Sequence, residues 1–187
     1  QARDELEGEF LESLFTGTYS SEAAIRSRAE RLNFDLSGDT VVLVARQDSA
    51  ADGSSRVRRD QLLMGAQGWI RRRAPAGLAT VRQGALAAVL RLPPGQEVPD
   101  VRRLAADRRL ECAGALGGSE VSVGVGRAKG CIAGVRASYR EGEQSLTMGG
   151  RLYGGGRVTN FADLGLHRLL FAMSGQPELR EFFEDQV

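Results

Sequence analysis

The segment at residues 120–150 reads EVSVGVGRAKGCIAGVRASYREGEQSLTMGG and changes its hydrophobic period once, at its glycines. Before the glycines, three valines alternate with small residues, as in a half-buried strand: Val121, Val123 and Val125. After them, apolar residues recur along one face of a predicted helix: Ile132, Val135, Tyr139 and Leu146. Charged residues take the other face: Arg136, Arg140, Glu141 and Glu143. The segment is therefore predicted to be a strand, a glycine loop and an amphipathic helix.

The chain before this segment begins with two predicted helices and a strand. The first helix ends at Gly17 and carries apolar residues at every fourth position: Leu6, Phe10 and Leu14. Ser21 is a suitable N-cap for the second helix, whose buried face is predicted to hold Ile25, Ala29 and Leu32. The apolar run TVVLVA at 40–45 has the length and composition of a central strand.

The order of elements from residue 40 predicts the fold class. A helix is expected at 56–73, then strands at 78–82 and 85–92 separated by Gln83 and Gly84, which is hairpin spacing, and then another helix before the strand at 121. Strand, helix, strand, strand, helix, strand is the split βαβ order. The prediction is thus an α+β, ferredoxin-like core: a four-stranded antiparallel sheet with helices on one face, and extra helices at both ends.

Composition excludes several classes of protein. The 25 basic and 24 acidic side chains nearly cancel, so no strong field would draw the whole chain to nucleic acid or to an anionic membrane. No apolar run approaches the roughly 20 residues that span a bilayer, and we expect a cytoplasmic protein. With only His167 and the cysteines Cys112 and Cys131, neither a zinc site nor a disulfide framework is expected. We predict no metal and no cofactor.

The glycine loop at 124–130, GVGRAKG, has two interpretations. It resembles a dinucleotide-binding fingerprint, but the third glycine of that pattern would fall at Lys129. We favour a structural interpretation, in which small residues let the strand end pack under the following helix. The functional alternative is an anion or phosphate site, with four candidate ligand-binding residues: Gly124, Gly126, Arg127 and Lys129.

Apolar strips on the terminal helices predict an assembly surface. The first helix carries Leu6, Phe10 and Leu14, and a last helix beginning at Pro177 carries Leu179, Phe182 and Phe183. Both strips lie among glutamates, which an anionic lipid surface would repel. We therefore predict a dimer or interdomain surface at these six residues, and a homodimer.

Five segments together resemble the GGDEF-like domain of PucR/CdaR-type bacterial transcriptional regulators: LESLFTG (11–17), RAERLNFDL (28–36), SVGVGRAKGCIAGVRASYREGEQSL (122–146), FADLGLHRLL (161–170) and ELREFF (178–183). The resemblance implies a core related to nucleotidyl-cyclase domains, and a helix-turn-helix domain outside this chain that binds DNA. It implies a helical lead-in at 1–35, a degenerate core at 36–160, and C-terminal helices at 161–187 that lead to the DNA-binding domain.

The same resemblance argues against cyclase activity. Diguanylate cyclases carry Gly-Gly-[Asp/Glu]-Glu-Phe at the hairpin between the second and third core strands, whereas residues 82–86 read RQGAL. Cyclases also place a metal-binding aspartate in the first strand, but here residues 41–46 contain no acidic side chain and the next one along the chain is Asp48. Two divalent cations at a triphosphate need several oxygen ligands, so we expect that the chain is not an enzyme.

These observations favour a non-catalytic regulatory and dimerisation domain that responds to a small-molecule effector. A first alternative is a nucleotide-binding sensor that lost cyclase activity. A second alternative is an enzyme of unrecognised type, which a clustering of Asp48, Asp52 and Glu120 around one cleft would favour.

Overall fold

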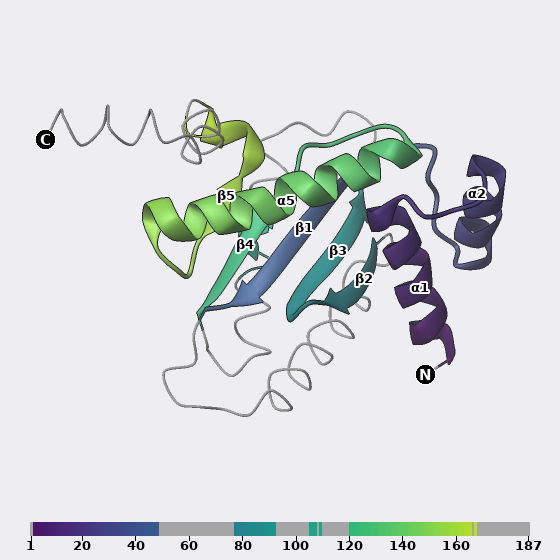
Figure 1. Ribbon diagram of the computed structural model, residues 1–187, viewed down its shortest axis with the longest axis horizontal. Helices are drawn as coiled ribbons and strands as arrows, with labels where there is room; N and C mark the ends of the chain where they lie inside the picture. The colour runs from purple at the N-terminus through teal and green to yellow at the C-terminus, as the bar shows by residue number, and fades with distance from the viewer. Residues whose placement is uncertain are drawn as a thin grey trace, which may run out of the picture.

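The computed structural model describes residues 2–48, 77–92, 105–107, 109, 120–165 and 167. Its centre is a five-stranded sheet in the order β2-β3-β1-β4-β5 (Figure 1). The strands are β1 (Thr40–Gln47), β2 (Gly77–Arg82), β3 (Ala85–Arg91), β4 (Val121–Val125) and β5 (Val158–Asn160). The first four pair antiparallel, and β5 adds a parallel edge strand beside β4. The predicted ferredoxin-like order of the four core strands is confirmed.

The apolar run at 40–45 forms the central strand, as predicted. β1 pairs with β3 on one side, where Thr40 lies opposite Arg91, and with β4 on the other, where Leu43 lies opposite Val125. The predicted hairpin joins β2 to β3. Its two turn residues have positive φ, 49° at Gln83 and 75° at Gly84, which matches the right-handed twist of the strands.

The helices begin and end near the positions that the sequence predicts. Helix α1 (Ala2–Thr16) ends before Gly17, which has a φ of 73°. Helix α2 (Glu22–Arg31) is capped by Ser21, whose hydroxyl accepts the amide hydrogen bond of Ala24 at 3.1 Å. Helix α5 (Ile132–Tyr153) follows the glycine loop, and a 3₁₀ turn, η1 (Phe161–Leu164), follows β5.

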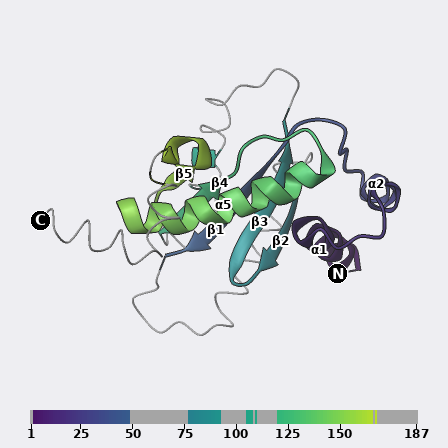
Figure 2. The same cartoon turned by 45° about the horizontal axis from the view of Figure 1, so that its top comes forward.

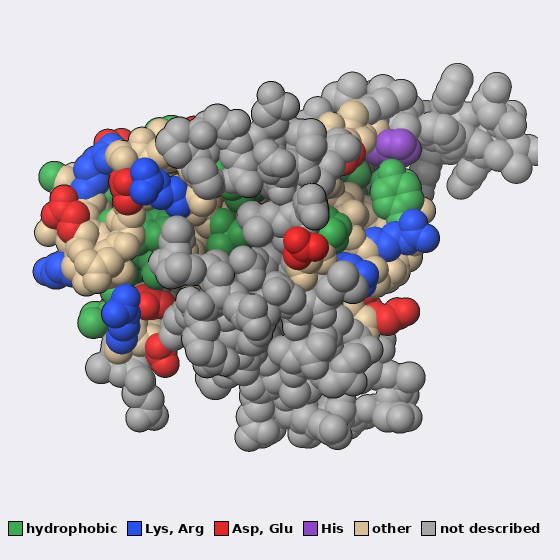
Figure 3. Space-filling view, turned by 180° about the vertical axis from the view of Figure 1, so that it is seen from behind, with side chains coloured by type: hydrophobic (Ala, Val, Ile, Leu, Met, Phe, Trp, Pro, Cys, Tyr) green, Lys and Arg blue, Asp and Glu red, His purple; other side chains and the backbone are tan. Residues whose placement is uncertain are grey.

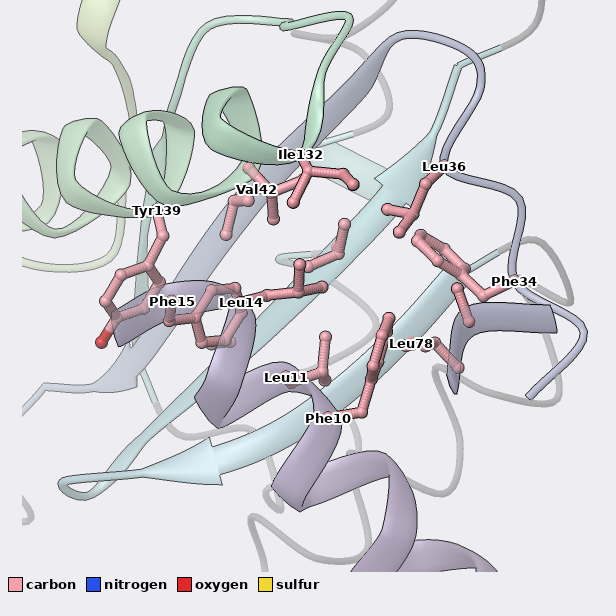
Figure 4. Packing of buried hydrophobic residues seen from close by; sticks show 14 of the residues in the cluster. Phe10, Leu11, Leu14, Phe15, Phe34, Leu36, Val42, Leu78, Ile132 and Tyr139 are labelled. Carbon is pink, nitrogen blue, oxygen red and sulfur yellow. The ribbon is translucent and has the colours of Figure 1, made fainter. Parts of the chain in front are cut away.

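Helices α1 and α5 pack on the same face of the sheet. In Figures 1 and 2, α5 crosses the sheet and α1 lies beside β2; both helices contact strands and each other. Large apolar side chains fill the space between them, several of which are drawn in Figure 4. This core includes Phe10, Leu11, Leu14, Phe15, Ile25, Phe34, Val42, Val44, Leu78, Val89, Ile132, Val135, Tyr139 and Leu146.

The opposite face of the sheet is buried as well. Its cluster combines alternate residues of four strands with Ala105, which is helical together with its described neighbours at 106 and 107. Of the two core helices that the sequence predicts on one face, the described part of the second, at 105–107, packs on this face, opposite α1 and α5, and the helix at 56–73 lies outside the described residues. Six consecutive residues of β1 are buried, because a strand that is apolar on both faces needs cover on both.

The predicted apolar strip on the first helix is only partly exposed. Phe10 and Leu14 are completely enclosed in the core, so the expectation that they lie on an assembly surface is wrong for these two residues. Leu6 remains 56% exposed. The sequence period identified the apolar face of α1 correctly, but this face packs against the chain's own sheet.

Several predictions fall on residues outside the described ranges. These are the helix at 56–73, the residues Asp52 and Cys112, and the strip at Leu179, Phe182 and Phe183. Within the described residues, no helix combines the length and the hydrophobicity that crossing a bilayer requires.

Candidate functional site

The glycine loop contains a β-bulge between β1 and β4. Regular pairing places Leu43 opposite Val125, and pairing resumes where Thr40 and Lys129 exchange backbone hydrogen bonds, each at 2.9 Å. Two residues lie between these positions on β1 and three lie between them on the β4 side, so one extra residue lies on the β4 side. Such a bulge bends the strand and redirects its side chains.

The bulge leaves the amide of Val42 without a ladder partner, and helix α5 supplies one. The Val42 carbonyl accepts the Gly126 amide at 3.0 Å, while the Val42 N–H donates to the Ser138 hydroxyl, also at 3.0 Å. Ser138 is fully buried. A side chain of α5 thus completes the hydrogen bonding of the central strand, because a buried amide without a partner would be costly.

Gly124 and Gly126 let α5 approach the sheet closely. A Cβ atom at Gly124 would overlap the carbonyl oxygen of Gly142, and one at Gly126 would overlap the carbonyl oxygen of Ser138. Both overlaps involve helix backbone, which cannot move aside alone. The close packing that the structural interpretation predicts is confirmed at these two residues. The Gly126 amide already donates to Val42, so it does not face a ligand.

Arg127 and Lys129 converge on the carboxylate of Glu141. Glu141 accepts hydrogen bonds from the Arg127 backbone at 2.8 Å and from its guanidinium at 2.6 and 3.0 Å, and the Lys129 ammonium lies 3.5 Å away. Glu141 is only 7% exposed. Its expected place on the outer, charged face of the helix is therefore wrong, and the reason is the Arg127 partner, which compensates the burial of the charge.

The electrostatics of this cluster are dominated by Glu141. Burial raises the pKa of the Glu141 carboxyl, but the side-chain and backbone hydrogen bonds from Arg127, with the charges of Arg127 and Lys129, outweigh burial and hold the pKa below its ordinary value. The hydrogen bond to Glu141 in turn raises the pKa of the Arg127 guanidinium. Both partners are therefore ionised over the neutral range.

The outer side of the cluster remains accessible. The Arg127 side chain is 49% exposed and that of Lys129 is 30% exposed. Arg127 also lies over the Phe161 ring, 5.1 Å from its centre, which connects the loop to η1. The structure thus brings together two of the four predicted ligand-binding residues, and places Gly124 and Gly126 beneath the helix. Anion binding by Arg127 and Lys129 stays a prediction.

Asp48 sits at the other end of the β1–β4 pair and is held by protein donors. Its Oδ2 atom accepts hydrogen bonds from the Ser122 hydroxyl and the Gly156 amide, both at 2.6 Å. Its own amide donates to the carbonyl of Glu120 at 3.0 Å. Across the described ranges, no group of three or more histidine, cysteine or acidic side chains is placed to hold a metal ion.

Sequence reasoning missed the two polar residues that organise this site, Ser138 and Glu141. A usable signal was present in the spacing of small residues along α5, which recur about every four positions on the face that meets β4: Gly134, Ser138, Gly142, Ser145 and Gly149. Such a row indicates a helix that lies close to its neighbour, and polar residues within it are buried too.

Comparison with known proteins agrees with this geometry. A family model described as "GGDEF-like domain" matches residues 16–148 of the 187. A search of curated proteins found no match. The matched region runs from the end of α1 through strands β1 to β4 and most of α5, so it includes the hairpin, the bulge and the Arg127–Glu141 pair. The chain therefore belongs to the GGDEF-like domain family.

Proposed function

We propose that this chain is the non-catalytic regulatory and dimerisation domain of a cytoplasmic transcriptional regulator of the PucR/CdaR type. It responds to a small-molecule effector, and DNA is bound by a helix-turn-helix domain outside this chain. The support is the resemblance of the five segments above, together with membership of the GGDEF-like family. The surface supports the placement of DNA binding outside this chain, because acidic and basic side chains of the described residues intermingle on the face shown in Figure 3.

The β2–β3 hairpin is the observation that carries the non-catalytic part of the proposal. Where cyclases carry acidic residues, the turn consists of Gln83 and Gly84, flanked by Arg82 and Ala85. The adjacent strand β1 is apolar and buried from Val41 to Ala45. A triphosphate with divalent cations would meet no carboxylate among these side chains.

The first experiment is to measure mass by light scattering over a concentration series, with and without GTP. We expect a dimer whose dissociation constant does not change with GTP. A monomer at all concentrations would contradict the dimerisation role. Incubation with GTP and Mg²⁺ should yield no cyclic dinucleotide, and turnover of GTP would contradict the non-catalytic role.

A nucleotide sensor is the second candidate, because Arg127 and Lys129 keep exposed cationic surface. Under this alternative, GTP would promote dimerisation or protect the glycine loop from hydrogen exchange, and Arg127→Gln would weaken the effect. Arg157→Gln, which removes another exposed arginine close to β5, is the matched control. An effect of GTP lost equally in both variants would indicate non-specific charge and would not support a site at the loop.

A further inference from the structure

Three segments far apart in the sequence meet at the side chain of Tyr139. The Phe15 ring of α1 stacks on the Tyr139 ring of α5, with centres 4.2 Å apart and planes 16° from parallel (Figure 4). The guanidinium of Arg82, the last residue of β2, lies over the same ring at 5.4 Å from its centre. Both aromatic side chains are almost fully buried. One aromatic ring is thus shared by α1, α5 and the base of the hairpin.

An ion pair and a hydrogen bond hold the side chains around the Tyr139 ring in place. Arg82 pairs with Glu12 of α1, with nitrogen and oxygen 3.3 Å apart. The Tyr139 hydroxyl donates to Glu143, one turn further along α5. Burial and this hydrogen bond raise the pKa of the Tyr139 hydroxyl, which therefore stays protonated and continues to donate.

The contacts of Arg82 stabilise a hairpin whose turn has an unfavourable backbone conformation. Gln83 follows Arg82 directly and adopts a positive φ of 49°, which is unfavourable for a residue with a side chain. The contacts of Arg82 with Glu12 and Tyr139 restrain the strand end that enters this turn. By contrast, the ion pair of Glu9, one turn earlier on α1, connects the helix to Arg28 of α2 and leaves the hairpin untouched.

We infer that α1 acts as a clamp on the β2–β3 hairpin, through Glu12 and Phe15 on the helix and Arg82 and Tyr139 on the body of the domain. When α1 is docked, the hairpin and the middle of α5 are ordered together. A displacement of α1, by a partner or by torque on the helix, loosens the hairpin. Because coupling is reciprocal, a change at the hairpin also loosens α1. The inference does not depend on the proposed regulatory role.

Hydrogen exchange of the intact chain tests the clamp. Glu12→Gln should raise the exchange rate of the hairpin amides at 81–86 by about two- to fivefold, the range expected for a partly exposed ion pair. Phe15→Leu, which removes the ring stacked on Tyr139, should also raise this rate. Glu9→Gln is the matched control and should leave these amides unchanged. Glu12→Gln is conservative and partly exposed, so it tests the clamp even if Phe15→Leu disturbs folding. In 1 M salt the difference between wild type and Glu12→Gln should vanish, since salt screens the pair.

The reciprocal measurement uses the hairpin side. Arg82→Gln should raise exchange at residues 12–16 of α1, whereas Arg91→Gln, which breaks the pair of the β3 end with Asp35, should not. The clamp is refuted if Glu12→Gln changes only α1, or if Arg82→Gln changes only the hairpin. Equal acceleration at every amide would also refute it, since that would indicate lower global stability without a specific coupling.

Discussion

At the scale of single residues, Ser138 supports the central strand. Its hydroxyl is the acceptor for the Val42 amide, which the bulge has removed from the ladder. We predict that Ser138→Ala lowers the free energy of unfolding by about 1–3 kcal/mol, because the amide is left buried without a partner. Urea denaturation measures the change. Thr147→Ala is the control: the Thr147 hydroxyl donates to the Glu143 carbonyl of its own helix and is exposed, and we expect a change within about 0.5 kcal/mol. Similar losses for both would contradict this role of Ser138.

Glu141 is the second residue that acts beyond its own helix, and its effect depends on pH. Glu141→Gln removes the charge that Arg127 and Lys129 share, and we expect a loss of about 1.5–3 kcal/mol at pH 7. The folded-state pKa lies below the ordinary value of 4.5, so the carboxylate is the form that folding favours. This stabilisation is complete about one pH unit above the unfolded value of 4.5 and disappears as the pH falls through the folded-state pKa.

The measurement is a set of denaturation curves for wild type and Glu141→Gln between pH 3 and 7. The difference in unfolding free energy should be constant above about pH 5.5 and should shrink towards acid. A difference that grows towards acid would mean that the carboxyl is stabilised in its protonated form. Glu143→Gln is a useful comparison, because Glu143 accepts from Tyr139 and does not contact Arg127.

At the scale of elements, the packing of α5 on β4 depends on glycine. We predict that Gly124→Ala and Gly126→Ala each destabilise the fold by about 1–3 kcal/mol or more, because a Cβ would force the helix away from the strand. Gly150→Ala is the matched control, since a Cβ there meets nothing within 4 Å. It should stabilise the fold by about 0.5–1 kcal/mol through helix propensity. Thermal denaturation reports both signs, and stabilisation by Gly124→Ala would refute the close approach.

At the scale of the whole molecule, α1 belongs to the same core as the sheet. Four of its side chains, Phe10, Leu11, Leu14 and Phe15, are almost completely enclosed. Each contributes about 1.5–3 kcal/mol on burial. Their sum is comparable with the net free energy of unfolding of a typical domain, about 5–15 kcal/mol. The family match begins at Thr16, after these residues. We predict that a fragment starting at Thr16 does not unfold cooperatively in urea, whereas the full chain does.

A pair of leucines on α1 provides the control for that prediction. Leu11 is fully buried and Leu6 is exposed. Leu11→Ala should cost about 2–5 kcal/mol, and Leu6→Ala should leave monomer stability nearly unchanged. Cooperative unfolding of the fragment, or equal effects of the two substitutions, would show that α1 is an appendage and not part of the core.

The sequence by itself determined the order of the described elements and most of their buried faces. The run at 40–45 predicts a central strand, the pair Gln83–Gly84 predicts a two-residue turn, and the change of period after Val125 separates β4 from α5. These are local signals, because they depend on side-chain periods and on the backbone freedom of glycine, which neighbouring residues in the chain supply.

Only the tertiary structure decided what covers each face. Glu141 reads as an exposed charge because its compensating partner, Arg127, lies 14 positions earlier in the chain and reaches it only through the bulge. The sequence predicts an assembly surface at Phe10 and Leu14 because the helical period of apolar residues identifies an apolar face but does not say what covers that face. Hydrophobic burial has no direction or preferred partner, so three-dimensional packing alone determined that α1 closes on its own sheet.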